Sequence, residues 1–170
     1  MENEDAPTEE GELTSRAPTE GDLVSLCRTL NELGARYMIV GGFAVIYSGY
    51  ARTTTDVDLL MDVDLDNEAK VYEALALLPD KAVLELQPGE VSQYTVVRVA
   101  DEITVDLMKS ASGIDYAEAA KDMVIRRVGD VDIPFASPRL LWRMKKNTHR
   151  EKDRADLLFL RQHYPEVVDD

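Results

Sequence analysis

The sequence has little cysteine, no long apolar run and few basic side chains, and each shortage narrows the possibilities. The single cysteine, Cys27, has no partner for an internal disulfide, and a thiol beside an apolar segment is typical of a small core residue. No apolar run approaches the roughly 20 residues that cross a bilayer, and the acidic N-terminus lacks the basic and then apolar pattern of a secretory signal. We therefore expect a cytoplasmic protein that has no membrane partner.

Basic side chains are outnumbered, since 19 Lys and Arg face 33 Asp and Glu, and the net charge is -14. The charge is unevenly distributed, because residues 1–22 alone carry a net charge of -7. This segment has almost no apolar side chains to bury, so burial cannot offset the entropy cost of ordering it. We expect residues 1–21 to form a disordered acidic tail, residues 22–165 a single domain, and residues 166–170 a short C-terminal tail.

Positive charge gathers in one stretch. Residues 139–154 hold seven basic side chains against two acidic ones, a net charge of +5. A surface of this kind favours an anionic ligand. For any single basic residue in it, a place on the solvated face of an amphipathic helix is an equally good interpretation.

A chain of 170 residues with 45% hydrophobic content supports one buried core. The apolar periodicity and the turn residues predict helices over 22–33, 43–50, 66–78 and 151–162, with a further helix starting at Ser137-Pro138. They predict strands over 37–40, 56–62, 83–86, 94–99, 103–108, 123–128 and 131–135. Asp22 and Asp66 are the expected N-caps of the first and third helices. The predicted fold class is one α/β (α+β) domain with a mixed or mostly antiparallel sheet and flanking helices.

The most informative segment is residues 41–60, GGFAVIYSGYARTTTDVDLL. Two glycines end a strand there, a helix begins, and the next strand opens with two aspartates one residue apart. Glycines let the backbone approach a phosphate closely, and a helix N-terminus adds N–H donors. Alternate strand positions turn Asp56 and Asp58 toward the same face. Two carboxylates arranged in this way predict a site for a hard cation such as Mg²⁺.

A third carboxylate, Asp106, lies in the otherwise apolar stretch 103–107. A charge in such a strand costs several kcal/mol unless it is paired or bound to a metal. If this strand neighbours the strand that carries Asp56 and Asp58, three acids converge on one metal site.

A calcium loop is a competing interpretation for a second acidic cluster. Asp62, Asp64, Asp66 and Glu73 occupy positions 1, 3, 5 and 12 of an EF-hand pattern. Position 6, where the sharp turn needs glycine, is Asn67, and the segment before the loop is a predicted strand instead of a helix. The sequence therefore disfavours calcium binding.

Two longer motifs extend the pattern around the acids. The first, Gly-Gly, then Gly, then Arg-x-Thr-x-Asp-x-Asp, is formed by Gly41, Gly42, Gly49, Arg52, Thr54, Asp56 and Asp58. The second, an apolar-Lys step and then Arg-x-Lys-Asp-x-x-Asp-Leu, is formed by Met144, Lys145, Arg150, Lys152, Asp153, Asp156 and Leu157. With these motifs, residues 23–162 resemble the nucleotidyltransferase superfamily, which includes DNA polymerase β, the lincosamide nucleotidyltransferases and the AbiEii/AbiGii-type toxins. The toxin-like or small bacterial branch is the nearest in pattern, and Phe43 departs from the Ser that many polymerase-like members carry after the glycines.

The resemblance implies an enzyme that transfers a nucleoside monophosphate from an NTP, such as ATP, to a hydroxyl or phosphate acceptor. Asp56 and Asp58 would bind two Mg²⁺ ions, for which Mn²⁺ substitutes, and Asp106 would hold one metal and help to deprotonate the acceptor hydroxyl. The residues implied in nucleotide binding are Gly41, Gly42, Arg52, Thr54, Thr55, Lys145, Arg150 and Lys152.

The implied partners are the NTP, an acceptor that is RNA or tRNA, a protein or a small molecule, and, in the toxin branch, an antitoxin protein. Lys152 and Asp156 lie four residues apart on one expected helix, so a pair between these two is an alternative to a role of Lys152 in substrate binding. The alternative function is a non-catalytic nucleotide-binding or protein-interaction module that retains the fold.

Overall fold

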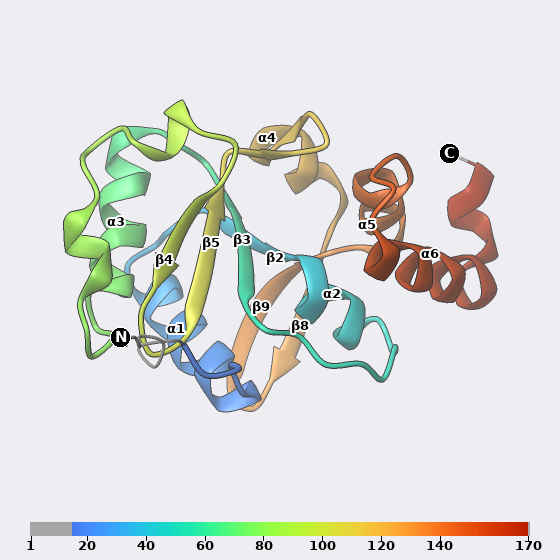
Figure 1. Ribbon diagram of the computed structural model, residues 1–170, viewed down its shortest axis with the longest axis horizontal. Coiled ribbons are helices and arrows are strands. Elements are labelled where there is room, and N and C mark those ends of the chain that lie inside the picture. The colour runs from blue at the N-terminus through green and yellow to red at the C-terminus, as the bar shows by residue number, and fades with distance from the viewer. Residues whose placement is uncertain (1–14, 170) are drawn as a thin grey trace, which may run out of the picture.

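A six-stranded mixed sheet is the framework of the computed structural model, which describes residues 15–169 (Figure 1). In spatial order its strands are β4 (Val97–Ala100), β5 (Thr104–Met108), β3 (Val57–Met61), β2 (Tyr37–Val40), β9 (Val131–Ala136) and β8 (Met123–Val128). The pairs β3–β5 and β2–β9 are parallel, and the other three pairs are antiparallel. A separate two-stranded sheet is formed by β6 (Ser110–Ala111) and β7 (Ile114–Asp115). The predicted mixed sheet is confirmed.

Helices flank this sheet, as the sequence predicts. Helices α1 (Glu20–Glu32) and α3 (Leu65–Leu75) pack against each other, whereas α2 (Gly41–Tyr47) follows β2 directly and packs on β3. Helices α5 (Pro138–Lys145) and α6 (Glu151–His163) and the 3₁₀ turn η4 (Pro165–Asp169) gather at the opposite end of the molecule from α3 (Figure 1). The remaining short elements are η1 (Ala82–Glu85), η2 (Val91–Gln93), α4 (Tyr116–Ala119) and η3 (Ala120–Asp122).

The core lies between the sheet and its helices. All four residues of β2 are buried, because the central strands are covered on both faces and can carry continuous apolar runs. Cys27 is fully buried in this core, and burial raises the pKa of its thiol to about 12. The interpretation of Cys27 as an unreactive core residue is therefore confirmed. No helix in residues 15–169 is both long enough and apolar enough to cross a bilayer.

The predicted strand over 83–86 is wrong, because residues 83–85 belong to the 3₁₀ turn η1 and Leu86 is its C-cap. The buried carboxylate of Asp101 accepts hydrogen bonds from the backbone N–H groups of Asp80 and Ala82, and Lys81 adopts a left-handed conformation with φ of 51°. These bonds bend the chain into a turn although three of the four residues over 83–86 are apolar. The strand expected from residue 94 begins at Val97.

Two helix caps also differ from the prediction. The N-cap of α1 is Thr19, and Asp22 is the third helical residue, whose carboxylate accepts the backbone N–H of Thr19 in a capping box. The N-cap of α3 is Asp64, whose carboxylate accepts the N–H of Asp66. In both cases an acid was predicted as the cap although it lies in the first turn of the helix, where acids are also favourable.

Most of the expected acidic tail, residues 1–14, lies outside the described residues. Arg16, near its end, pairs with Asp22 and Glu102, so the predicted boundary at residue 22 falls inside a packed segment. At the other end, the expected tail 166–170 includes residues of η4, where Val167 is buried. Val167 is one of the buried residues of the hydrophobic core.

Candidate metal and nucleotide site

Three carboxylates meet where β3 and β5 run side by side. The register pairs Asp58 directly with Asp106, which confirms that the two acid-bearing strands are neighbours. Each of Asp56, Asp58 and Asp106 offers a carboxylate oxygen, and these oxygens all lie within 4.8 Å of one another. In residues 15–169 no other group of three or more His, Cys, Asp or Glu side chains is arranged in this way, and the residues of the disfavoured calcium loop do not form such a group.

The glycine pair lets the backbone pass against this cluster. Gly41 has φ of 69°, and a Cβ placed on it would lie 1.9 Å from Oδ2 of Asp58. A Cβ on Gly42 would lie 2.4 Å from Oγ1 of Thr54. Neither position can carry a side chain without displacing the acid or the loop that leads to it. The backbone at the two glycines thus passes close to Asp58 and Thr54, and the predicted approach to a phosphate stays a prediction.

Two of the three acids have raised pKa values. Burial, together with the charges of Asp56 and Asp106, raises the pKa of Asp58 to about 7. The pKa of Asp56 is also raised, by burial and by the charge of Asp106. The cluster therefore resists full ionisation and favours a bound cation.

Arg98 is a member of the site that the sequence analysis missed. It lies on β4 directly opposite Asp106, and its guanidinium contacts both Asp106 and Asp56. The alternation Val97-Arg98-Val99 shows that Arg98 points away from the core, but the register that brings it to Asp106 is not visible in the sequence.

Three of the four basic residues expected at the nucleotide, Arg52, Lys145 and Arg150, are held by two buried acids of α6. Asp156 lies 2.6 Å from Nη1 of Arg52 and 3.3 Å from Nζ of Lys145. Asp153 accepts hydrogen bonds of 2.9 Å from Lys145 and 2.8 Å from Arg150. The alternative pair between Lys152 and Asp156 is wrong, because Asp156 faces Arg52 and Lys145 instead.

Hydrogen bonding around Asp153 is strong enough to reverse the effect of its burial. Burial alone would raise its pKa, but hydrogen bonds from Thr148, Lys145 and Arg150 outweigh it and lower the pKa to about 2. Asp153 therefore stays ionised and keeps α5 and the start of α6 together. The second sequence motif contained Asp153 and Asp156, and their three-residue spacing on one helix was the signal for a shared role.

Two cavities share the carboxylates. A polar one of about 120 Å³ is lined by the three acids, Arg98 and seven of the eight residues expected at the nucleotide. The missing one, Thr55, is exposed and lines neither cavity. The polar cavity therefore brings together nearly the whole set that the sequence predicts.

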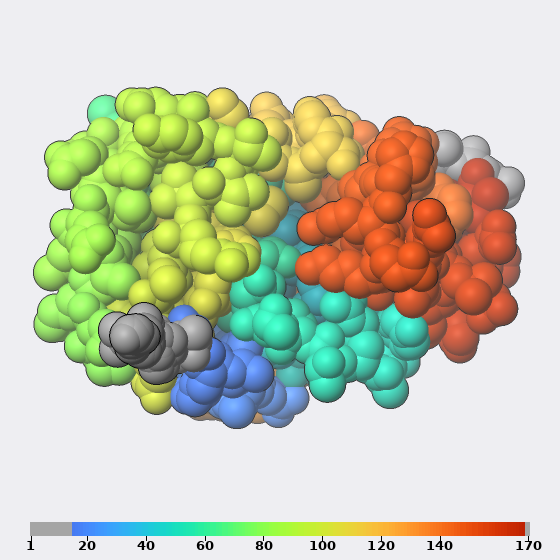
Figure 2. Space-filling view, viewed as in Figure 1, coloured from blue at the N-terminus to red at the C-terminus, as the bar shows by residue number. Residues whose placement is uncertain are grey.

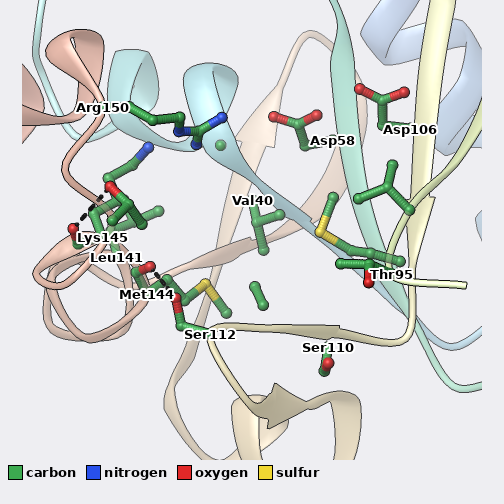
Figure 3. Close-up of a pocket in the computed structure, with 15 residues that line it drawn as sticks. Val40, Asp58, Thr95, Asp106, Ser110, Ser112, Leu141, Met144, Lys145 and Arg150 are labelled. Atoms are coloured by element: carbon green, nitrogen blue, oxygen red, sulfur yellow. Dashed lines mark hydrogen bonds between the residues drawn. The ribbon is translucent and has the colours of Figure 1, made fainter.

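The second cavity, of about 280 Å³, adjoins Asp58 and Asp106 and extends between β5 and α5. Figure 2 shows a hollow between the yellow β4–β5 region and the orange α5–α6 region. In Figure 3, Asp58 and Asp106 lie along one rim, Lys145 and Arg150 along the side formed by α5 and α6, and Val40 between them. Leu141 and Met144 make part of the remaining wall apolar.

Comparison with known proteins identifies the fold. No family model and no curated protein matches the chain. An antigenic nucleotidyltransferase-like protein from Paracoccidioides brasiliensis is 20% identical, with a TM-score of 0.50 over 93% of this chain and 79% of its own. A candidate nucleotidyltransferase from Thermotoga maritima is 13% identical, with a TM-score of 0.52 over 88% of this chain and 97% of its own. The chain therefore has a nucleotidyltransferase-like fold, and membership of the toxin-like branch stays a prediction.

Loss of Asp156 should destabilise the protein strongly, because its side chain is 1% exposed and holds two cations. Removing one partner of a buried ion pair costs about 3–5 kcal/mol, and we expect Asp156→Ala to lower the free energy of unfolding by this amount in urea titrations. The control is Glu151→Ala on the same helix, where the partner is Arg154 and the acid is 90% exposed. That change should cost less than about 1 kcal/mol. Equal losses in the two variants would contradict the buried network.

The metal-free protein should lose stability as the pH rises through the range in which Asp58 titrates. An unfolded aspartate ionises near pH 4, whereas folded Asp58 keeps its proton up to about pH 7. The stabilisation due to the protonated group is complete below about pH 4 and is lost as the pH rises toward about 7. In EDTA, Asp58→Asn should flatten this fall in urea unfolding free energy, while Asp132→Asn on β9 follows the parent. Parallel curves for Asp58→Asn and the parent would show that Asp58 is not the group whose raised pKa causes the fall in stability.

Proposed function

We propose that the protein is a metal-dependent nucleotidyltransferase that moves a nucleoside monophosphate from an NTP to a hydroxyl acceptor. The observation that carries the proposal is that Asp56, Asp58 and Asp106 lie close together. They lie beside Gly41 and Gly42, two positions that have no room for a side chain. The fold supports the same conclusion, since both solved structures described above bear nucleotidyltransferase names. Seven of the eight residues expected at the nucleotide line one polar cavity with these acids.

The donor set fits Mg²⁺. Three carboxylates supply hard oxygen ligands, and their oxygens are close enough to share one or two ions. Burial and the charges of Asp56 and Asp106 raise the pKa of Asp58, and a divalent cation beside the carboxylate would offset both effects. When bound, Mg²⁺ supplies positive charge at the phosphates and acidifies a nearby hydroxyl. Asp56 and Asp58 would hold the ions, with Asp106 as a ligand of one of them.

The chain's own residues account for the rest of the reaction. The backbone at Gly41 and Gly42 leaves room for a phosphate beside the acids. Asp106 accepts the proton of the acceptor hydroxyl, whose oxygen forms a bond to the α-phosphorus as the bond to pyrophosphate breaks. Lys152, which has no ion pair within residues 15–169, lines the polar cavity and offsets charge on the leaving pyrophosphate.

The acceptor that best suits the larger cavity is a small molecule that has a hydroxyl group and an apolar part. A volume of about 280 Å³ is near the lower end of ligand pockets and admits about one ring-sized group beside Asp58 and Asp106. The basic stretch 139–154 gives little support to an RNA acceptor, because Lys145 and Arg150 are paired with acids of α6. A toxin role and an antitoxin partner rest on the sequence resemblance alone.

Asp106→Asn should separate binding from turnover. Mg²⁺ with a non-hydrolysable NTP should raise the melting temperature of the parent and of this variant, since a ligand bound only by the folded state stabilises it. With NTPs radiolabelled at the α-phosphate, transfer by the variant should fall at least about a hundredfold. The acceptors are total RNA, added proteins and small hydroxylated compounds with an apolar ring. The control is Asp132→Asn, another strand aspartate that pairs with an arginine across the sheet.

Each result bears on a different part of the proposal. Equal labelling by Asp106→Asn and the parent would remove Asp106 from the reaction. A parent that binds the nucleotide but labels no acceptor would favour the non-catalytic module. Labelling of RNA in preference to the small compounds would overturn the assignment of the acceptor. Absence of a thermal shift in the Asp56→Asn and Asp58→Asn double variant is expected, and an undiminished shift would place the nucleotide elsewhere.

A further inference from the structure

Arg98 occupies the side of the acid cluster that a metal ion needs. Its Nε lies 2.9 Å from Oδ1 of Asp106, and its Nη2 lies 2.9 Å from Oδ2 of Asp106 and 3.2 Å from Oδ2 of Asp56. Both carboxylate oxygens of Asp106 therefore accept a guanidinium hydrogen bond. A metal ion must compete with Arg98 for oxygens that are already engaged.

The position of Arg98 makes this competition possible without disturbing the core. β4 is an edge strand, and the Arg98 side chain is 61% exposed. Charge and hydrogen bonds hold the guanidinium in place, with little packing around it. Arg98 also lines the polar cavity expected to hold the triphosphate, so a displaced side chain would remain beside new anionic partners.

We propose that Arg98 is a resident counter-cation that couples metal binding to nucleotide binding. In the absence of metal, its guanidinium offsets the repulsion among the three carboxylates. A divalent ion and the guanidinium repel each other when both contact the oxygens of Asp106, so they compete for this carboxylate. A free ion must displace Arg98 without offering it another partner, whereas an ion that arrives with a triphosphate brings one.

This inference rests on the proposed function and adds a property to it. The site selects the metal–nucleotide complex over the free metal, because the triphosphate receives the arginine that the metal displaces. Arg98 acts here through the metal ligands and the phosphates, as a positioning residue. Its removal should therefore change metal affinity directly, in a measurement that requires no turnover.

The chain contains a matched control for Arg98. Arg127 lies on β8, the edge strand at the other side of the sheet, and its guanidinium contacts Asp132 directly opposite on β9 at 3.2 Å. The Arg127 side chain is 63% exposed, nearly the same as that of Arg98. Both arginines lie on an edge strand opposite an aspartate of the next strand, but Asp132 is exposed, accepts one contact and is not part of the three-acid group.

The experiment measures Mn²⁺ binding by the electron paramagnetic resonance signal of the free ion, with and without a non-hydrolysable NTP. Arg98→Gln should bind free Mn²⁺ at least about tenfold more tightly than the parent, since it removes the competing cation. The nucleotide should tighten Mn²⁺ binding strongly in the parent and in Arg127→Gln, and much less in Arg98→Gln. Arg127→Gln should match the parent in both conditions.

Unchanged or weaker Mn²⁺ binding by Arg98→Gln would overturn the proposal while leaving the metal site intact. Absence of Mn²⁺ binding in all three proteins, with and without nucleotide, would instead overturn the proposed function and the Arg98 inference with it. The two failures are therefore distinguishable.

A measurement on the parent keeps the test valid if Arg98→Gln folds poorly. In ¹⁵N NMR spectra of the metal-free parent, the Nε–H of Arg98 should exchange slowly because it is bound to Asp106. Mg²⁺ with the nucleotide should shift this signal, and Mg²⁺ alone should do so only at much higher concentration. A signal that stays unchanged at saturating Mg²⁺ and nucleotide would show that Arg98 remains on the acids.

Discussion

Repulsion among three carboxylates is the constraint on which the rest of the site depends. The parallel pairing of β3 and β5 sets Asp58 opposite Asp106, and Asp56 lies close enough to join them. Burial, together with the charges of Asp56 and Asp106, raises the pKa of Asp58 to about 7. A fold can retain such a cluster only where cations are within reach. Arg98 meets that need from the edge strand, where its side chain is 61% exposed.

On the basic side of the site the charges are reversed, since two buried acids hold three basic side chains. Asp153 and Asp156 are 1% exposed and fix the cations of α5, of the loop after α2 and of the start of α6. These contacts orient Arg52, Lys145 and Arg150 before any ligand arrives, which lowers the ordering cost on binding. The net charge of residues 139–154 also overstates the free positive surface. Asp156 pairs with Lys145 but lies just beyond that stretch, so its negative charge is not counted in the sum.

The sequence predicted those parts of the site that depend on local patterns. Gly41-Gly42 and the alternation of Asp56 and Asp58 indicate a backbone approach and a shared strand face without knowledge of the fold. Asp106 could be assigned only on the condition that its strand adjoins theirs, which is a matter of topology. Arg98 could not be found, because the register of β4 on β5 decides its partner. The pair of Arg52 with Asp156 joins residues 104 positions apart, and η1 turns because of hydrogen bonds to Asp101, which no local propensity reveals.

The central claim is that Asp56, Asp58 and Asp106 form one metal centre that accepts a nucleoside triphosphate. The most direct measurement is anomalous diffraction from crystals grown with Mn²⁺ and a non-hydrolysable NTP. We expect an anomalous peak about 2.1 Å from carboxylate oxygens of all three aspartates, with the triphosphate against Gly41 and Gly42 and the Arg98 guanidinium turned from Asp106 toward the phosphates. A peak elsewhere, or a bound nucleotide that leaves the Arg98–Asp106 pair in place and the three acids without metal, would contradict the claim.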